Sequence, residues 1–217
     1  MSGGYPSVPD DRLTTDGWTL RSRSEGAVFR MPGMTVTGYT LLYGDEQLRK
    51  ALAEADLETQ SIGPEHASEG LLDGAEDEIG RFFFATSLSF QPPLPPGIGT
   101  TLVLPAVTNQ ARQSLTSDLR ARGFEQLEWD NRQRLRTESG DRGWLWKCTA
   151  RLPISDNENR HAALELEGWQ AIWTTDGSFR IAGGAYPISG AESVLGALSK
   201  SATQFREELL ELIRAVR

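Results

Sequence analysis

The sequence predicts an α+β protein in which an antiparallel β-sheet, built as a meander, packs against helices. Three observations predict this fold. Four strand-like segments in the second half of the chain are separated by turns too short for a parallel crossover, which needs about a dozen residues. Asp176-Gly177 lies between two of these segments and is a strong hairpin signal. One helical pattern precedes the four segments and another follows them, so both helices would cover the sheet.

The first half of the chain predicts three short strands, one helix and a fourth strand. Pro32-Gly33 marks the turn between the second and third strands. Asp45 has the position of a helix N-cap, and apolar residues follow it at helical spacing. The predicted strands cover residues 18–23, 27–31, 34–43 and 81–90, and the helix covers residues 45–55.

The second half predicts a short strand, a helix, the four strands of the meander and a final helix. The first of these helices ends at Gly123, a residue suited to the left-handed conformation found at helix C-termini. The final helix begins at a capping box of Ser189 and Glu192. The strands cover residues 100–104, 124–136, 143–152, 162–174 and 178–182, and the helices cover residues 106–122 and 190–216.

The final helix, residues 190–216, carries an apolar stripe that allows two interpretations. Its apolar residues recur at intervals of three and four from Leu195 to Val216. A coiled coil would use such a stripe to form a homo-oligomer or to hold a protein partner. A helix lying across an antiparallel sheet needs the same stripe, and we favour this second arrangement.

The chain reads as a flexible tail over residues 1–12 and a single α+β domain over residues 13–217. An internal repeat divides this domain into two similar halves, residues 13–105 and 106–217. Residues 36–43 and 166–173 share the order apolar, polar, Gly, aromatic, polar, apolar, apolar, aromatic. The apolar alternation changes phase at Gly38 and at Gly168, which predicts a β-bulge or a bend at each glycine. Two related halves would then build one continuous sheet.

The formal net charge of -8 comes mostly from one segment. Residues 51–80 contain nine acidic residues and no basic ones, which leaves 21 acids against 22 bases elsewhere. We interpret residues 56–80 as an acidic, solvated loop, with a calcium-binding loop at residues 73–78 as the alternative. The acidic balance disfavours nucleic acid and membranes as partners. Three lysines against 19 arginines indicate either a GC-rich genome or a halophile.

Cysteine and histidine are scarce, which narrows the available chemistry. The single cysteine, Cys148, forms no internal disulfide and favours a cytoplasmic location. It lies among tryptophans on one strand face, so we interpret it as an inert core residue. The two histidines, His66 and His161, have no second ligand at metal-binding spacing, and we expect neither a metal nor a cofactor. No segment has the ~20 apolar residues of a membrane span.

One strand pattern supplies candidate catalytic and binding residues. Glu165 and Glu167 alternate on a strand, so paired carboxylates could act as catalytic acid and base. Without a bulge at Gly168, Trp169 and Trp173 would share their face and could bind a sugar or a cationic ligand. The favoured alternative is an exposed acidic edge that bends at Gly168 and turns both tryptophans into the core.

A second pattern supplies a candidate binding surface. Arg132, Arg134 and Arg136 alternate on one face of a strand, as in a surface that binds nucleic acid. Acidic residues interleave with them in the sequence: Glu125, Glu128, Asp130, Glu138 and Asp141. These acids nearly cancel the positive charge, so a solvated sheet face is the favoured interpretation.

Three C-terminal motifs carry a family resemblance: GWQAIWTTDG at residues 168–177, AGGAYP at residues 182–187 and ELLELIRAVR at residues 208–217. Through these motifs, roughly the last fifty residues resemble uncharacterised proteins of haloarchaea, a resemblance that implies no function. The helix–meander–helix order also resembles the PsbP/Mog1-like sandwich, which implies a non-catalytic binding protein.

The expected function follows from the absence of a catalytic motif in a chain rich in Trp and Arg, residues suited to interfaces. We expect a soluble, non-catalytic binding or assembly protein. The alternative is a small hydrolase or transferase that uses Glu165 and Glu167 as acid and base.

Overall fold

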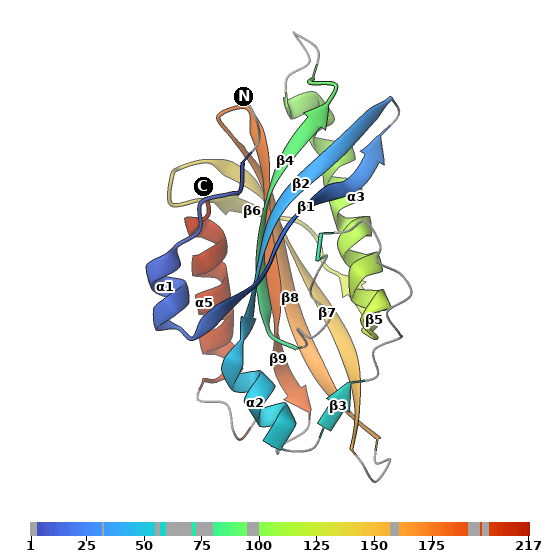
Figure 1. The fold of residues 1–217 in the computed structure, drawn as a ribbon, viewed down its shortest axis with the longest axis vertical. Helices are drawn as coiled ribbons and strands as arrows, with labels where there is room; N and C mark the ends of the chain where they lie inside the picture. Colours follow the sequence, from blue (N-terminus) through green and yellow to red (C-terminus); the bar gives the residue numbers. More distant parts are fainter. Residues whose placement is uncertain are drawn as a thin grey trace.

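The computed structural model describes residues 4–31, 33–54, 57–59, 71–72, 80–94, 100–156, 161–190, 196 and 200–217. Within these residues, nine strands form one antiparallel sheet with helices on both of its faces (Figure 1). The predicted α+β fold with an antiparallel meander is therefore confirmed. None of the helices in these ranges is long and apolar enough to cross a membrane.

The elements have the following bounds. The helices are α1 (Asp10–Thr15), α2 (Glu46–Glu54), α3 (Thr100–Ala121) and α5 (Ala202–Ala215). The strands are β1 (Trp18–Met31), β2 (Met34–Asp45), β3 (Leu57–Thr59), β4 (Phe82–Gln91), β5 (Glu125–Trp129), β6 (Gln133–Arg136), β7 (Arg142–Asp156), β8 (His161–Thr175) and β9 (Ser178–Gly190).

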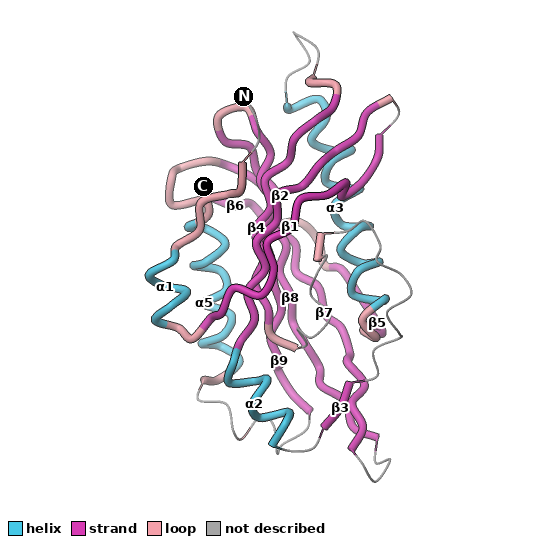
Figure 2. Tube along the Cα trace, viewed as in Figure 1, coloured by secondary structure: helices cyan, strands magenta, loops and turns pink. Residues whose placement is uncertain are grey.

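The strands lie in the order β1-β2-β4-β9-β8-β7, and every pair is antiparallel. Figure 2 colours the strands of this sheet magenta and the helices beside it cyan. The outer edge of β7 is paired in turn with β6, β5 and β3. These three short strands therefore cover an edge that would otherwise expose a long row of unpaired backbone groups.

Two hydrophobic cores lie on opposite faces of the sheet, which we call the α3 face and the α5 face after the helices that cover them. The core of the α3 face contains Val107 and Ala111 of α3 together with Leu48 of α2. The core of the α5 face contains Leu209 of α5 and Leu13 of α1. The fold thus has three layers, with α3 on one side of the sheet and α1 and α5 on the other (Figure 1).

The strand order places two antiparallel sets of three strands side by side, β1-β2-β4 and β9-β8-β7. The middle strands, β2 and β8, carry the repeated sequence motif. Val36 and Leu166 pack into the core of the α3 face, and Leu41 and Ala171 pack into that of the α5 face. The motif therefore has the same orientation in both sets. A relation between the two halves stays a prediction, as does the likeness to the PsbP/Mog1-like sandwich.

Gly38 and Gly168 do not lie at β-bulges, contrary to the prediction. Both keep continuous register with their neighbours, whereas the bulged residues include Val28 in β1 and Ile188 in β9. A Cβ atom at Gly38 would lie 2.5 Å from Val28 Cγ1, and one at Gly168 would lie 2.7 Å from Cys148 Sγ. The motif requires glycine because a neighbouring side chain packs directly over the backbone.

Local signals predicted several boundaries correctly. Asp176 and Gly177 both have positive φ, 49° and 73°, as a two-residue type I′ hairpin turn requires. Asp45 caps α2, because its Oδ1 accepts a hydrogen bond of 2.8 Å from the backbone N–H of Gln47. Gly123 ends α3 with a φ of 83°.

The strand predicted over residues 100–104 is wrong, because α3 already begins at Thr100. The β-branched residues of this segment favour a strand in isolation. In the fold, however, Val103 continues the apolar row of Val107 and Ala111 at intervals of four and packs against the same core. Burial of this helical row outweighs the local preference.

Two strands, β5 and β6, replace the single strand predicted over residues 124–136. They pair with different parts of β7, and residues 130–132 belong to neither of them. Gln126 has a φ of 50°, which interrupts the regular pairing of β5. The sequence pattern resembles one long strand, but the chain forms two strands with a break at residues 130–132.

The final helix begins later than predicted, because β9 continues to Gly190 in register with β8. Ser189 is thus part of a strand, and the capping box is formed by Ser201 and Gln204. The Ser201 N–H donates to Gln204 Oε1 at 2.9 Å, and the Gln204 N–H donates to Ser201 Oγ at 3.4 Å. Residues 191–195 and 197–199 of the predicted helix lie outside the described residues.

The apolar stripe of α5 is buried within the chain. Phe205, Leu209 and Leu212 all belong to the core of the α5 face. This is the favoured arrangement, a helix lying across an antiparallel sheet. The stripe is accordingly not exposed for a coiled coil with a second copy.

Residues 4–12 contact the rest of the fold, although the sequence predicts a flexible tail over residues 1–12. Ser7 and Arg217 exchange two backbone hydrogen bonds, of 3.0 and 2.9 Å, which join the two ends of the chain. Tyr5 packs against the core of the α5 face and meets the Tyr39 ring edge-on, with 5.6 Å between ring centroids. An aromatic contact and a backbone pairing therefore hold this segment, and α1 follows from Asp10.

The predicted acidic loop, residues 56–80, is described only in part, and the described parts are packed. Residues 57–59 form β3, which pairs with β7. Leu71 and Leu72 are buried, and their backbone N–H groups donate to Asp118 Oδ2 at 2.7 and 3.1 Å. The alternative calcium loop at residues 73–78 lies outside the described residues.

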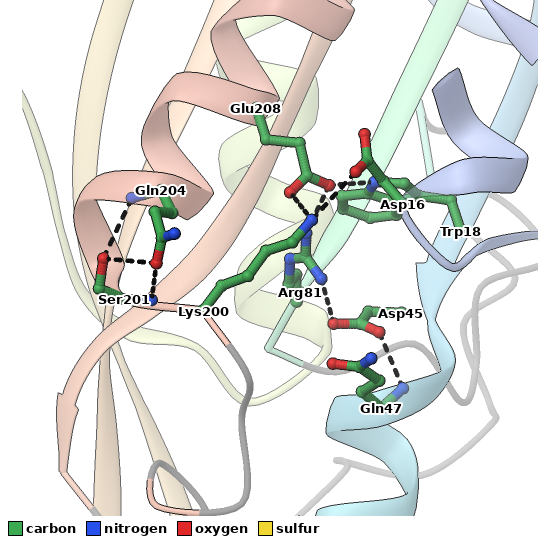
Figure 3. Close-up of polar contacts among 9 residues, drawn as sticks. All are labelled: Asp16, Trp18, Asp45, Gln47, Arg81, Lys200, Ser201, Gln204 and Glu208. Carbon is green, nitrogen blue, oxygen red and sulfur yellow. Dashed lines mark hydrogen bonds and ion pairs between the residues drawn. The ribbon is translucent and has the colours of Figure 1, made fainter. Parts of the chain in front are cut away.

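A buried cation joins the elements at one end of the α5 face. The side chain of Arg81, just before β4, is only 2% exposed. Its guanidinium donates hydrogen bonds to Asp45 at the end of β2 and to Glu208 of α5, the latter at 2.7 Å (Figure 3). The same group lies between two aromatic rings, 4.4 Å from the Trp18 centroid and 4.3 Å from the Phe205 centroid.

Further polar contacts extend this arrangement, which we call the Arg81 cluster: Asp16, Trp18, Asp45, Arg81, Lys200 and Glu208 (Figure 3). Glu208 accepts a hydrogen bond of 2.6 Å from the Trp18 indole and another of 2.6 Å from Lys200. Lys200 also lies 3.1 Å from Asp16. Burial lowers the pKa of Lys200, but its hydrogen bonds to Glu208 and Asp16 outweigh this effect, so the pKa is raised.

Replacement of Arg81 tests whether this cluster holds the layers together. We expect Arg81→Met to lower the free energy of unfolding by about 3–5 kcal/mol, because it removes the cation from the buried Asp45 carboxylate and leaves Glu208 with the Lys200 cation alone. Arg81→Lys should recover only part of this loss, since an ammonium lacks the planar fork that reaches both carboxylates. Urea denaturation of the purified protein measures both effects.

A matched control is the exposed pair of Arg12 and Glu138, which are 46% and 40% exposed and 2.6 Å apart. Arg12→Met should change the free energy of unfolding by less than about 1 kcal/mol. Glu208→Gln, which keeps the size of the side chain, provides a milder variant if Arg81→Met does not fold. Equal stability of Arg81→Met and Arg12→Met would contradict the role given to the cluster.

Candidate functional site

The two glutamates predicted as a catalytic pair, Glu165 and Glu167, lie on the same face of β8 but in different surroundings. The Glu165 side chain is 48% exposed, and its Oε1 lies 3.7 Å from Arg151 Nε. The Glu167 side chain is only 16% exposed. One is thus a surface ion pair, and the other belongs to a largely buried group.

Glu167 accepts hydrogen bonds from two aromatic side chains of the α5 face. Its Oε1 accepts from the Tyr186 hydroxyl and, at 3.1 Å, from the Trp169 indole, while Lys147 Nζ lies 3.6 Å from Oε2. Burial, followed by the hydrogen bond to Glu167, raises the pKa of Tyr186 well above its ordinary value. A hydrogen bond to Asp130 raises the pKa of Lys147. The carboxylate of Glu167 therefore satisfies buried polar groups.

Trp169 and Trp173 share the face of Glu165 and Glu167, because no bulge interrupts β8 at Gly168. Both indoles belong to the core of the α5 face, with 2% and 1% of their surface exposed. They therefore offer no exposed platform for a sugar or a cationic ligand. The structure brings these four residues onto one face without forming an open site.

An open groove of about 450 Å³ lies on the other side of the sheet, between α3 and β5. We call it the arginine groove, and it is lined by Asn109, Arg112, Gln113, Thr116, Ser117, Arg120 and Trp129. Its volume falls in the range of small-molecule sites. The lining combines two cations, amides, hydroxyls and one indole, and it includes no carboxylate.

Arg112 is the central cation of the groove. Its guanidinium carbon lies 4.9 Å from the ring centroid of Trp129 and 5.7 Å from that of Trp146. Its Nε is buried and has no hydrogen-bond partner within the described residues. A buried donor without a partner is costly, so an acceptor that reached this atom would be bound favourably.

The groove depends on how α3 and β5 fold. Two rows at helical spacing, Asn109, Gln113, Ser117 and Arg112, Thr116, Arg120, lie beside the buried row of α3. Trp129, the last residue of β5, lies across from them, and its indole N–H donates to Thr116 Oγ1 at 3.1 Å. Helix α3 therefore supplies the polar lining of the groove, and the end of β5 supplies its aromatic side.

The three arginines predicted as a binding surface lie near this groove in the fold, on the same side of the sheet. Arg134 is paired directly with Trp144 of β7, and Arg136 with Arg142. Residues opposite each other in an antiparallel pair share a face, and Trp144 packs against the core of the α3 face. Arg132 lies over the Trp144 ring, 4.2 Å from its centroid. All three arginines are exposed.

Arg112 and Trp129 were not among the binding residues predicted from the sequence. The two rows of polar residues on α3 contain no acidic residue, and this pattern could have indicated a binding site for an anion. The contact of Arg112 with Trp129 joins residues of different elements, which no local pattern predicts.

The described residues contain no group of three His, Cys, Asp or Glu side chains that could hold a metal ion. His66 lies outside the described residues, and His161 is the first residue of β8.

Cys148 is buried on β7, with 5% of its surface exposed. The pKa of its thiol is raised to about 12, mainly by burial and to a smaller extent by the nearby carboxylates Glu167 and Asp130, which together outweigh a hydrogen bond to the Gly168 backbone that lowers it. The thiol is therefore neutral at physiological pH, as expected of an inert core cysteine.

Thiol titration tests this assignment. We expect a chromogenic disulfide reagent to leave native Cys148 unmodified at pH 8 and to modify one thiol per chain in denaturant. Because the folded pKa is raised, the unfolded chain loses its proton first, so deprotonation favours unfolding. The free energy of unfolding should fall between pH 9 and about pH 12, by up to about 1.4 kcal/mol per pH unit from this group.

Cys148→Ala is the matched control, and its stability should fall less steeply over the same range of pH. Rapid modification of the native protein, or identical slopes for the two proteins, would contradict the burial of the thiol.

Comparison with known proteins places the chain in a family. No curated protein and no solved structure matches it. The model of one family, described as Domain of unknown function (DUF6517), matches residues 5–217, which extends well beyond the C-terminal motifs that carried the resemblance. The haloarchaeal origin implied by those motifs stays a prediction. The chain therefore belongs to the DUF6517 family, a domain of unknown function.

Proposed function

We propose that this protein is a non-catalytic binding protein that holds an anionic ligand in the arginine groove. The proposal rests on the lack of polar partners for the side chains of Arg112 and Arg120 within the described residues. Neither side chain has a hydrogen bond or an ion pair within the described residues, although both line the same groove. Two unpaired cations in one concave site favour a ligand that brings negative charge.

The chemistry of the lining narrows the ligand class. A guanidinium binds carboxylate and phosphate through two parallel hydrogen bonds, and it stacks on planar groups. The amides of Asn109 and Gln113 and the hydroxyl of Ser117 can donate or accept further hydrogen bonds. The indole of Trp129 adds an apolar face. A phosphate or carboxylate attached to a flat ring uses all of these features.

The same lining supports binding over catalysis. General acid–base chemistry needs a group whose pKa lies near the working pH, such as His or a perturbed carboxylate. The groove is lined by arginines, neutral amides, hydroxyls and an indole, and the lining contains no His, Asp or Glu side chain. This lining can hold and orient a ligand but has no group suited to moving a proton.

The alternative function, a hydrolase or transferase that uses Glu165 and Glu167, has less support. Glu165 is half exposed and ion-paired, whereas Glu167 is engaged by Tyr186, Trp169 and Lys147. Both lie on the α5 face, away from the arginine groove. A cytoplasmic location and a halophilic source stay predictions from composition.

Isothermal titration calorimetry with adenosine 5′-monophosphate tests the proposal, and adenosine provides a probe without phosphate. We expect the monophosphate to bind with a Kd of about 0.1–1 mM and adenosine to bind more weakly. Arg112→Met and Arg120→Met should each weaken binding about tenfold, because each removes a charged hydrogen bond of about 1.5 kcal/mol.

Arg151→Met is the matched control, because Arg151 lies on the α5 face and pairs with Glu165. This variant should bind the monophosphate as the unmodified protein does. Equal binding of adenosine and its monophosphate, or no effect of Arg112→Met and Arg120→Met, would refute the proposal.

A further inference from the structure

A second stack of arginine on tryptophan lies on β7, beside the arginine groove. Arg112 lies between Trp129 and Trp146, and Trp144 lies two residues before Trp146 on the same face of β7. Two residues of a strand span about 6.6 Å, so the two indoles are neighbours. Arg132 covers Trp144 at 4.2 Å. Two Arg–Trp stacks therefore lie in series on the α3 face.

Beyond the second stack, three more arginines bring positive charge to the same face. Arg134 lies opposite Trp144, and Arg136 lies directly opposite Arg142. Like charges in directly opposed positions destabilise a sheet. None of these arginines forms an ion pair with another of the described residues. An anion bound between Arg136 and Arg142 would relieve their repulsion.

Three of the five acidic residues that interleave with these arginines in the sequence lie toward the α5 face. The Asp130 carboxylate is 3.2 Å from Lys147, and that of Glu138 is 2.6 Å from Arg12. Glu128 is paired with Thr149, which faces away from the α3 face. These three acids therefore do not cancel the positive charge on the α3 face.

We infer that this surface, from the arginine groove along β7 to β6, binds single-stranded nucleic acid. This inference rests on the proposed function, because the groove would hold one nucleotide of the strand. Backbone phosphates would contact the exposed arginines, and bases would stack on the outer faces of the Arg132 and Trp129 side chains. A series of stacking platforms beside a row of cations is the arrangement found in proteins that bind single strands without reading their sequence.

The negative net charge of the chain does not oppose this inference. Nine of its 30 acidic residues lie in residues 51–80, and the remainder of the chain is balanced. Local potential over a surface, rather than net charge, governs the binding of a strand that lies on it. An acidic peptide would also meet the charge requirement, but it would not use the stacking platforms.

Fluorescence anisotropy with a labelled twelve-nucleotide oligothymidylate tests the inference, and an abasic strand of equal length and charge is the matched probe. We expect the oligothymidylate to bind at least tenfold more tightly than adenosine 5′-monophosphate does. The abasic strand should bind about fivefold more weakly or worse, because it cannot stack. Arg132→Met should reduce this preference for bases.

The β6 arginines are tested by their salt dependence. Arg134→Met and Arg136→Met should each reduce the slope of log Kd against log salt concentration by about 0.7, since each removes one phosphate contact. Both residues are exposed, so the variants should remain folded. Arg151→Met on the opposite face should leave affinity and slope unchanged.

Any of four results would overturn the inference. Equal affinity for the abasic strand or for polyglutamate of equal charge would indicate a general polyanion site or an acidic protein partner. Tighter binding of duplex than of single-stranded DNA would indicate that stacking is not used. Binding of the monophosphate without tighter binding of the oligonucleotide would reject this inference and leave the proposed function in place. If neither ligand binds, both proposals fail.

Discussion

The buried guanidinium of Arg81 constrains how the layers of this fold are assembled. A charge removed from water is costly unless its donors are all paired, and Arg81 finds its partners on three different elements. Asp45 lies at the junction of β2 and α2, and Glu208 lies on α5. Trp18, whose ring the guanidinium contacts, is the first residue of β1. Because Glu208 must reach this cation, α5 can dock in only one register along the sheet.

The docking of α5 determines which parts of the sheet are enclosed. With α1 and α5 in place, Trp169, Trp173 and most of Glu167 are buried on the α5 face. On the opposite face, α3 contacts β1, β8 and β9. Trp129, Trp144 and the arginines beside them are thus left at least partly exposed at the margin of that helix, where ligands can reach them. The α5 face therefore holds the layers together, and the α3 face carries the proposed binding surface.

Local chemistry made much of the fold predictable, because some residues restrict the backbone wherever they occur. Asp176-Gly177 specifies a type I′ turn, Asp45 caps a helix, and Gly123 ends one, and each was predicted from sequence. The start of α3 was not predicted, since the packing of Val103 overrides its local preference. Gly38 and Gly168 were misread as bulges because their real constraint is a neighbouring side chain.

The candidate site was less predictable for a related reason. Alternation along a strand predicted Arg132, Arg134 and Arg136 on one face, and Arg134 and Arg136 of β6 do share the α3 face. Alternation could not show where the interleaved acids would find partners. Asp130 turns to Lys147, and Glu138 reaches Arg12 near the other end of the chain. No sequence pattern indicated that Arg81 is buried, since a single arginine at the start of a strand is common on protein surfaces. The fold determines which distant charges pair, so no short segment of the sequence predicts these pairs.

The central claim, that ligands bind on the α3 face, can be tested directly through the six tryptophans of the chain. Two-dimensional NMR of the indole N–H groups during titration with oligothymidylate gives one signal for each of them. The signals of Trp129 and Trp144 should shift, because these indoles border the arginine groove and the β6 arginines. The signals of Trp18, Trp169 and Trp173 on the α5 face should remain in place. Shifts confined to Trp169 and Trp173, with none at Trp129 or Trp144, would contradict the account.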